Sequence, residues 1–184
     1  MPQRIPIQLH VANALQWLGT LYRNPADALK EHVSNAIDEH LKAQLSGTAV
    51  SHCHVRFTLD RRQVIVEYAY GMSRTEFETA LQRVADSAKR TGTARTIGRL
   101  GIGIFGFQQI GRKCTFFSRK TIAGDTLRVA LKEGSDEAVL ETALARDRLE
   151  KPGLKVVISE LKFDPTRPRG PLAPTSLRRS FSTS

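Results

Sequence analysis

Apolar positions near the start of the chain recur at helical spacing. In residues 8–22, apolar side chains return every three or four positions, which predicts a helix. A second helix should run from about residue 25 to 44. Asn24 suits its N-cap, Pro25 its first turn, and Asp27 the positive end of the helix dipole.

The next stretch changes to a period of two residues, which is typical of strands. Residues 54–60 and 63–68 alternate between apolar and polar side chains around a short turn, so we expect a β-hairpin. Ser73 and Glu76 have the spacing of a capping box. The helix that follows them should extend to about residue 84.

The second half of the chain predicts more strands and one short helix. Strands are expected at residues 112–119, 125–132 and 154–161. A short helix is expected within 134–147. From Asp164 the chain becomes rich in Pro and Arg. We therefore expect one domain at 1–163 and, at 164–184, a tail or the start of a truncated following segment.

The second predicted helix carries a polar stripe. Because a helix turns by about 100° per residue, Glu31, Asn35 and Asp38 share one narrow face. The apolar residues expected to face the core are Leu29, Val33 and Ile37. The stripe is either an ordinary solvated face or one wall of a metal–nucleotide site. In the second case Asn35 offers Mg²⁺ an amide oxygen, and Glu31 is placed to deprotonate a water.

Four glycines lie within nine residues at 98–106, GRLGIGIFG, after a polar loop at 86–98 that we expect to be mobile. Glycine lets the backbone approach a ligand, and successive N–H groups can hold an anion. Close helix–sheet packing is the alternative explanation. The segment also contains the dinucleotide spacing Gly101-x-Gly103-x-x-Gly106, but the residues before it are too polar for a central parallel strand. We therefore favour phosphate binding.

Composition places the chain among globular proteins. It has 40% apolar and 25% charged residues, and no apolar run approaches the roughly 20 residues that span a bilayer. No signal-peptide pattern is present at the N-terminus, so we expect a cytoplasmic protein without a membrane partner. The segment His52-Cys53-His54 is better explained as a strand start than as a metal site, because alternate residues point to opposite faces.

The net charge is +10, and it is uneven. Residues 85–120 hold eight Lys and Arg residues against Asp86 alone. Such a region predicts an anionic partner, namely nucleotide phosphates, nucleic acid or an acidic surface.

Three elements in order resemble one known superfamily. They are Glu31-x-x-x-Asn35-Ala36-x-Asp38, the segment VEYAYGM at 66–72, and the basic loop with GRLGIG at 98–103. Together they resemble the GHKL (Bergerat-fold) ATPases, which include gyrase B, the ninety-kilodalton heat-shock chaperone, histidine kinases and MutL. The chaperone-like branch is the most similar. The likeness covers residues 10–161 and implies a two-layer α/β sandwich of a mixed β-sheet with helices on one face.

The resemblance also implies roles for individual residues. Glu31 corresponds to the general base, Asn35 to the Mg²⁺ ligand, and Asp38 to an acid that lines the nucleotide pocket. Lys89, in the lid, would approach phosphate. Further nucleotide contacts are implied at Glu67, Gly71, Met72, Gly98, Arg99, Leu100, Gly101, Ile102 and Gly103.

Two departures fall on the adenine side. The family pattern Asp-x-Gly-x-Gly reads Glu67-Tyr68-Ala69-Tyr70-Gly71 here. The family's late Gly-Thr pair reads Gly153-Leu154, so the threonine hydroxyl is missing. We expect an ATP-binding domain that hydrolyses ATP with Mg²⁺ and drives a conformational cycle of a larger assembly. The resemblance leaves an ATP-dependent homodimer open. The alternatives are a degenerate nucleotide-binding scaffold without turnover and a basic nucleic-acid-binding module using residues 85–120.

Overall fold

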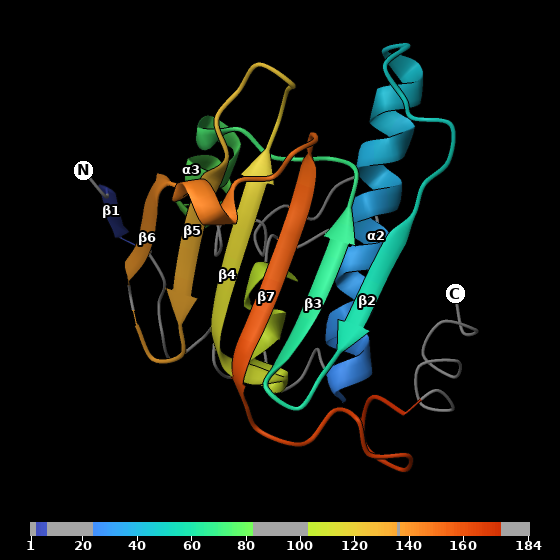
Figure 1. Cartoon of the computed structure of the whole chain (residues 1–184), viewed down its shortest axis with the longest axis vertical. Helices are drawn as coiled ribbons and strands as arrows, with labels where there is room; N and C mark the ends of the chain where they lie inside the picture. Colours follow the sequence, from blue (N-terminus) through green and yellow to red (C-terminus); the bar gives the residue numbers. More distant parts are fainter. Residues whose placement is uncertain (1–2, 7–23, 83–102, 136, 174–184) are drawn as a thin grey trace, which may run out of the picture.

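The computed structural model describes residues 3–6, 24–82, 103–135 and 137–173. Helices, strands and 3₁₀ turns (η) alternate along the described chain (Figure 1). Their order is β1 (Gln3–Pro6), α2 (Pro25–Leu45), β2 (Val55–Leu59), β3 (Gln63–Tyr68), α3 (Arg74–Gln82), η2 (Gly103–Gln109), β4 (Gly111–Arg119), β5 (Leu127–Lys132), β6 (Glu137–Thr142), η3 (Ala145–Asp147) and β7 (Gly153–Leu161).

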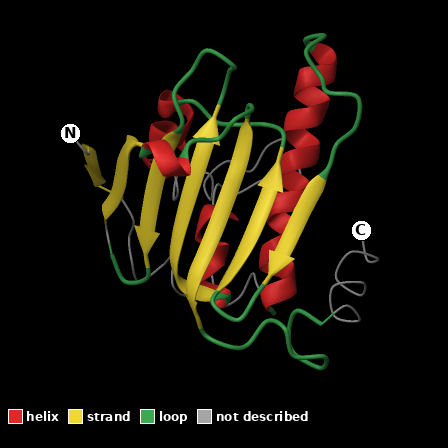
Figure 2. Ribbon diagram, in the orientation of Figure 1, coloured by secondary structure: helices red, strands yellow, loops and turns green. Residues whose placement is uncertain are grey.

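The seven strands form one sheet in the order β1-β6-β5-β4-β7-β3-β2. Figure 2 shows α2, α3 and η2 on the same face of this sheet, so the predicted two-layer α/β architecture is confirmed. The prediction of a mixed sheet is wrong for the described strands, because every pairing between them is antiparallel. The reason is that β7 lies between β3 and β4, which run in the same direction and would otherwise pair in parallel.

Local sequence signals account for the confirmed elements. At the start of α2 the Asn24 side chain accepts a hydrogen bond from the Asp27 N–H at 3.1 Å. At the start of α3 the capping box is formed, because Ser73 N donates to Glu76 at 2.6 Å and Glu76 N donates to Ser73 Oγ at 3.3 Å. The hairpin β2–β3 and strands β4, β5 and β7 also lie where the alternation predicted them.

The core lies between the sheet and the helices. Its sheet side is formed by alternate residues of the central strands, and Val64, Val66, Val156 and Ile158 are fully buried. On the helix side, Leu29, Phe77 and Leu81 are fully buried. Because side chains alternate between the two faces of the sheet, one face packs against the helices. The other face is turned toward the viewer in Figure 1.

Two stretches differ from the prediction. The helix expected within 134–147 is wrong, because Glu137–Thr142 forms strand β6 and only Ala145–Asp147 forms a 3₁₀ turn. Ala138 and Leu140 are buried at a spacing of two, and a short apolar run of this kind fits a strand as well as a helix. Strand β1 was not predicted. The helix expected at 8–22 and the loop at 86–98 lie outside the described residues.

The inner face of α2 also differs from the prediction. Leu29 is buried as expected, but Val33 is only partly buried and Ile37 is 39% exposed. His32 and Ala36 lie in the core instead. The helix is rotated so that small Ala36 faces inward, and His32 fills the space one turn before it.

His32 generates a prediction about stability and pH. Burial lowers the pKa of His32 from 6.5 to about 4, because the interior disfavours its charged form. The unfolded chain therefore takes up a proton at a pH at which the folded chain does not. The His32 imidazole should not affect the free energy of unfolding above pH 6.5. As the pH falls toward 4, it should lower the free energy of unfolding by up to about 3 kcal/mol.

Chemical denaturation across this pH window tests the effect. His32→Leu should remove most of this part of the pH dependence, whereas the same change at exposed His54 should leave it in place. Equal pH dependence in wild type and His32→Leu would contradict the assignment.

Candidate functional site

The polar stripe of α2 exists in the structure. Glu31, Asn35 and Asp38 are each partly buried, between the core face of the helix and its exposed face. Helical rise places Asn35 about 6 Å, and Asp38 about 10 Å, along the axis from Glu31. The three side chains therefore line one wall rather than forming a compact cluster.

The surroundings of Glu31 raise the pKa of its carboxyl. Burial raises the pKa of its carboxyl, and the negative charge of Asp38 raises it further, while Lys30 partly opposes the shift. A carboxylate with a raised pKa holds a proton more strongly, which is what general-base chemistry requires. Glu31 and Asp38 therefore interact electrostatically along the stripe.

The glycine segment approaches α2 at its described end. Gly103 begins η2, and η2 packs against α2. The neighbouring positions Lys89 and Gly98, Arg99, Leu100, Gly101 and Ile102 lie outside the described residues. The structure therefore brings the stripe helix and the end of the glycine segment together, and the predicted phosphate contacts before Gly103 stay predictions.

The turn after β3 is held tightly against two strands. A Cβ at Gly71 would lie 2.2 Å from the carbonyl oxygen of Arg119 and 2.7 Å from that of Gly153. Only glycine fits this position without movement of the backbone. Next to it, Tyr70 OH lies 2.6 Å from His40 Nδ1, so the turn also contacts α2.

Glu67 lies on the other face of the sheet. Its neighbours Val66 and Tyr68 face the helices, since Val66 is fully buried and the pKa of Tyr68 is raised by burial and by Glu39 of α2. Strand alternation therefore directs Glu67 outward, where its cross-strand partners are Arg56 and Lys155.

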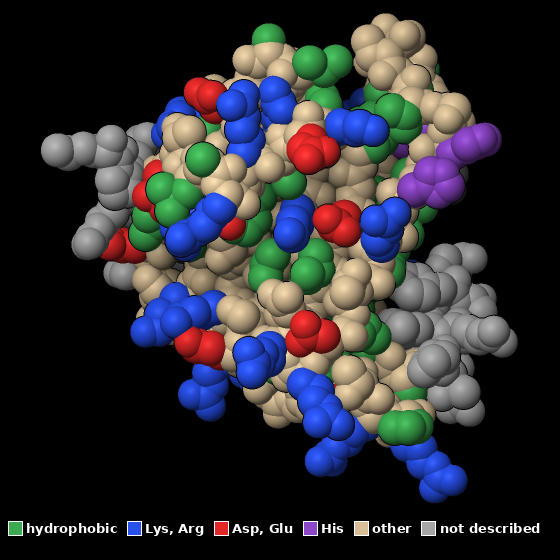
Figure 3. All heavy atoms as spheres, in the orientation of Figure 1, with side chains coloured by type: hydrophobic (Ala, Val, Ile, Leu, Met, Phe, Trp, Pro, Cys, Tyr) green, Lys and Arg blue, Asp and Glu red, His purple; other side chains and the backbone are tan. Residues whose placement is uncertain are grey.

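Figure 3 shows Lys and Arg interspersed with Asp and Glu on this open face. The structure does not bring Glu67 to the α2 stripe. Its predicted contact with adenine stays a prediction.

A buried hydroxyl lies one strand away from Leu154. Leu154 is buried and pairs with Ser118 on β4, which is also fully buried. The Ser118 hydroxyl accepts a bond from Met72 N at 2.6 Å and donates to Met72 O at 2.8 Å. Sequence reasoning missed Ser118 because the contact joins residues 46 positions apart, and no local pattern marks it.

Asn35 is the residue that could hold Mg²⁺. Its amide oxygen is a hard, neutral donor, and within the described parts of the chain its side chain makes no hydrogen bond. The described residues contain no cluster of three or more His, Cys, Asp or Glu with metal-binding geometry. Cys53 points to α2, where its Sγ lies 3.5 Å from the Ala36 carbonyl, while His52 and His54 are exposed.

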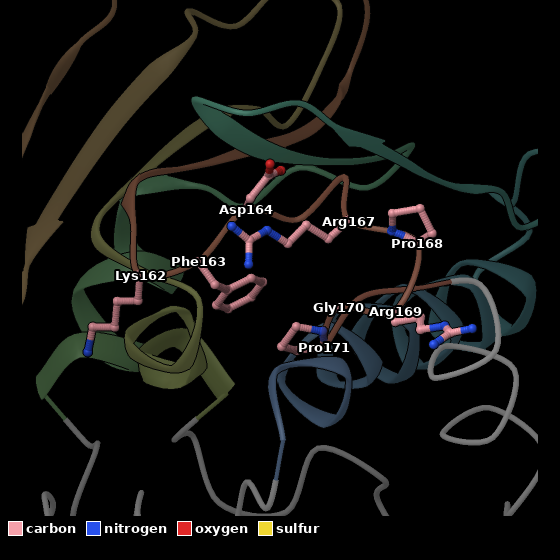
Figure 4. Close-up of a pocket in the computed structure, with 8 residues that line it drawn as sticks. All are labelled: Lys162, Phe163, Asp164, Arg167, Pro168, Arg169, Gly170 and Pro171. Atoms are coloured by element: carbon pink, nitrogen blue, oxygen red, sulfur yellow. The ribbon is translucent and has the colours of Figure 1, made fainter.

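A separate hollow lies at the opposite end of β7 (Figure 4). It has a volume of about 840 Å³ and follows Leu161, whereas Gly71 contacts Gly153 at the start of the strand. Nine strand residues separate these ends, roughly 25 Å. Its lining residues are Lys162, Phe163, Asp164, Arg167, Pro168, Arg169, Gly170 and Pro171. The hollow is therefore distinct from the Gly71 turn.

The segment after Asp164 packs onto the domain over part of its length. Leu172 and Ala173 are almost fully buried. The boundary at 163 stays a prediction. No helix in the described ranges has the length and apolar character needed to cross a membrane.

The outward placement of Glu67 can be tested by reversing its charge. Glu67→Lys would put three cations in a row with Arg56 and Lys155, which should lower stability by about 0.5–1 kcal/mol. Because the row is on the surface, added salt should restore most of the loss. The measurement is thermal melting at low and high ionic strength, with Thr58→Lys as a control on the same face. A large loss that salt does not restore would show that Glu67 points inward.

Comparison with known proteins agrees with the geometry. Residues 22–154 match the family model described as "Histidine kinase-, DNA gyrase B-, and HSP90-like ATPase". This match covers more than half of the chain and spans α2, the Gly71 turn, the glycine segment and the start of β7. A search of curated proteins found no match. The chain belongs to the family of histidine kinase-, DNA gyrase B- and HSP90-like ATPases, whose domains bind ATP.

Proposed function

We propose that this domain hydrolyses ATP with Mg²⁺ and that Glu31 is the general base. The observation that carries the proposal is the raised pKa of Glu31 on a stripe it shares with Asn35. The helix that bears this stripe packs against η2, at the end of the glycine segment. A base, a candidate metal ligand and a candidate phosphate-binding segment thus meet at one helix.

The chemistry follows from these positions. Glu31 accepts a proton from a water as that water attacks the γ-phosphorus, and the bond to the β–γ bridging oxygen breaks. Asn35 would hold Mg²⁺, which when bound neutralises charge on the phosphates. Asp38 supports the basicity of Glu31 by its charge. Lys89 and the backbone N–H groups of 98–103 would hold the β- and γ-phosphates.

Turnover would then drive a conformational cycle in a larger cytoplasmic assembly, by analogy with the chaperone-like members of the family. An ATP-dependent homodimer belongs to the same proposal. The alternative is a degenerate scaffold that binds ATP without turnover. ATP binding by the wild-type protein with no phosphate release would favour this alternative.

Nucleic-acid binding through residues 85–120 has less support. Four basic residues of this region are described, and all four are already engaged. Lys113 lies 2.5 Å from Glu160, Lys120 lies 2.9 Å from Glu76, and Arg112 lies 3.9 Å from Glu133. Arg119 is buried among backbone carbonyls. Acids thus lie beside three of the eight basic residues of this region, and Arg119 binds backbone carbonyls. The other four basic residues lie outside the described residues.

Glu31→Ala tests the general base. It should lower kcat for ATP hydrolysis by about 10²–10⁴-fold, because the water loses its proton acceptor, while ATP affinity stays within about threefold. Turnover is measured by phosphate release and affinity by calorimetry. Glu39→Ala is the matched control, since Glu39 lies on the same helix and pairs with Lys42 at 2.5 Å. ATP binding with unchanged turnover in Glu31→Ala would reject the assignment.

Asn35→Ala tests the metal ligand separately. It should weaken binding of ATP in the presence of Mg²⁺ more than binding in its absence, because only the Mg²⁺ complex uses the amide oxygen. Equal loss under both conditions would mean that Asn35 serves the fold or the nucleotide directly.

A further inference from the structure

Ser118 is a fully buried hydroxyl at the end of a central strand. Its two hydrogen bonds, at 2.6 Å and 2.8 Å, go to the N–H and the carbonyl of the same residue, Met72. A reciprocal pair of bonds fixes both the position and the rotation of that peptide segment. Met72 is the last residue of the turn that follows β3.

The next residue of β4 holds the preceding residue of the turn. Gly71 packs against the Arg119 carbonyl so closely that no Cβ fits between them. Two consecutive residues of β4, Ser118 and Arg119, therefore fix two consecutive residues of the turn. Displacing the turn would break the Ser118 bonds and open the Gly71 contact together.

Arg119 extends this support to the surrounding loops. Its buried guanidinium donates to the carbonyls of Gly124, Ile122, Leu149 and Glu150. The last two of these carbonyls lie just before β7, whose first residue, Gly153, also contacts Gly71. The end of β4 thus joins the loops on either side of the turn into one framework.

The register places Ser118 beside the position of the missing hydroxyl. Ser118 and Tyr68 are the cross-strand neighbours of Leu154, one on each side. All three lie at the end of the sheet that carries the turn, on the face toward the helices. A hydroxyl is therefore present one strand away from Leu154.

We propose that Ser118 is the positioning residue for the base end of the nucleotide site. Its hydroxyl fixes the position of the Ala69–Met72 turn relative to the bound base. Ser118 would thereby take the place of a hydroxyl at position 154, where this chain has Leu154. The inference rests on the proposed nucleotide site. Ser118 acts through Met72, because its hydroxyl already donates to one backbone group and accepts from another.

The consequence of losing the hydroxyl follows from the contacts. Ser118→Ala leaves the Met72 N–H and carbonyl without their partner and frees the turn to shift. An unsatisfied buried donor or acceptor is costly, so the turn should shift to reach new partners, and ATP binding should weaken about tenfold. Groups that hold only the phosphates should be unaffected.

The experiment compares two ligands by calorimetry with Mg²⁺ present. Ser118→Ala should bind ATP about tenfold more weakly than wild type, whereas inorganic tripolyphosphate should compete with equal strength against both proteins. Ser118→Cys provides a second variant that fills the same space, since its thiol is a weaker hydrogen-bond partner. It should show the same selective loss of ATP affinity even if the alanine variant folds poorly.

Thr126→Val is the matched control. Thr126 is a buried hydroxyl that accepts a bond from Leu149 N at 3.0 Å, and this bond joins two residues outside the turn. The Thr126→Val variant should lose about as much thermal stability as Ser118→Ala, while its ATP affinity stays within about twofold of that of wild type.

Three results would overturn the inference. The first is wild-type ATP affinity in both Ser118 variants. The second is an equal loss of ATP and tripolyphosphate. The third is a similar ATP loss in Thr126→Val. Failure of the wild-type protein to bind ATP at all would instead reject the proposed function, and the inference with it.

Discussion

The close backbone approach at Gly71 is the constraint on which the proposed site depends. The turn, the end of β4 and the start of β7 meet there without a side chain between them. Any other residue would push the turn off the sheet, because the nearest atoms are backbone carbonyls that belong to two paired strands. The distance between the turn and α2 is thereby set by the sheet itself. The Tyr70–His40 contact then connects the turn to the stripe helix.

The phosphate side and the base side of the proposed site are built differently. Glu31, Asn35 and Asp38 come from one helix, so their relative positions follow from helical geometry alone. The base side is assembled from the ends of β3, β4 and β7, and each contact joins residues far apart in the sequence. Small shifts of the neighbouring elements therefore leave the relative positions of the three side chains of the stripe unchanged. The base side forms only when β3, β4 and β7 pair in the correct register. Long-range contacts such as Ser118–Met72 are therefore important, because they hold these strand ends and the turn together.

This difference also decides what could be predicted from the sequence. Periodicity and caps predicted α2, the hairpin and α3, because these elements depend on neighbours within a few residues. They also placed the stripe on one face. They failed at 134–147, where Ala138 and Leu140 fit either period, and at His32, whose burial depends on the rotation of α2 against the sheet. Ser118 could not be predicted, because its partner Met72 lies in the turn after β3, 46 positions away.

The position of Glu67 shows where reasoning from a motif and reasoning from register diverge. A motif aligns Glu67 with a carboxylate that contacts adenine, but strand alternation puts Tyr68, not Glu67, on the face toward α2. One residue of register is enough to move a side chain to the opposite face of a sheet. With Glu67 between Arg56 and Lys155, the inner face at this level offers Tyr68, Leu154 and an engaged Ser118 hydroxyl. Base recognition on the sheet side would then rest on the shape and position of the turn rather than on a charge. A rigid turn is the requirement for recognition by shape, and the Gly71 contact and the Ser118 bonds provide that rigidity.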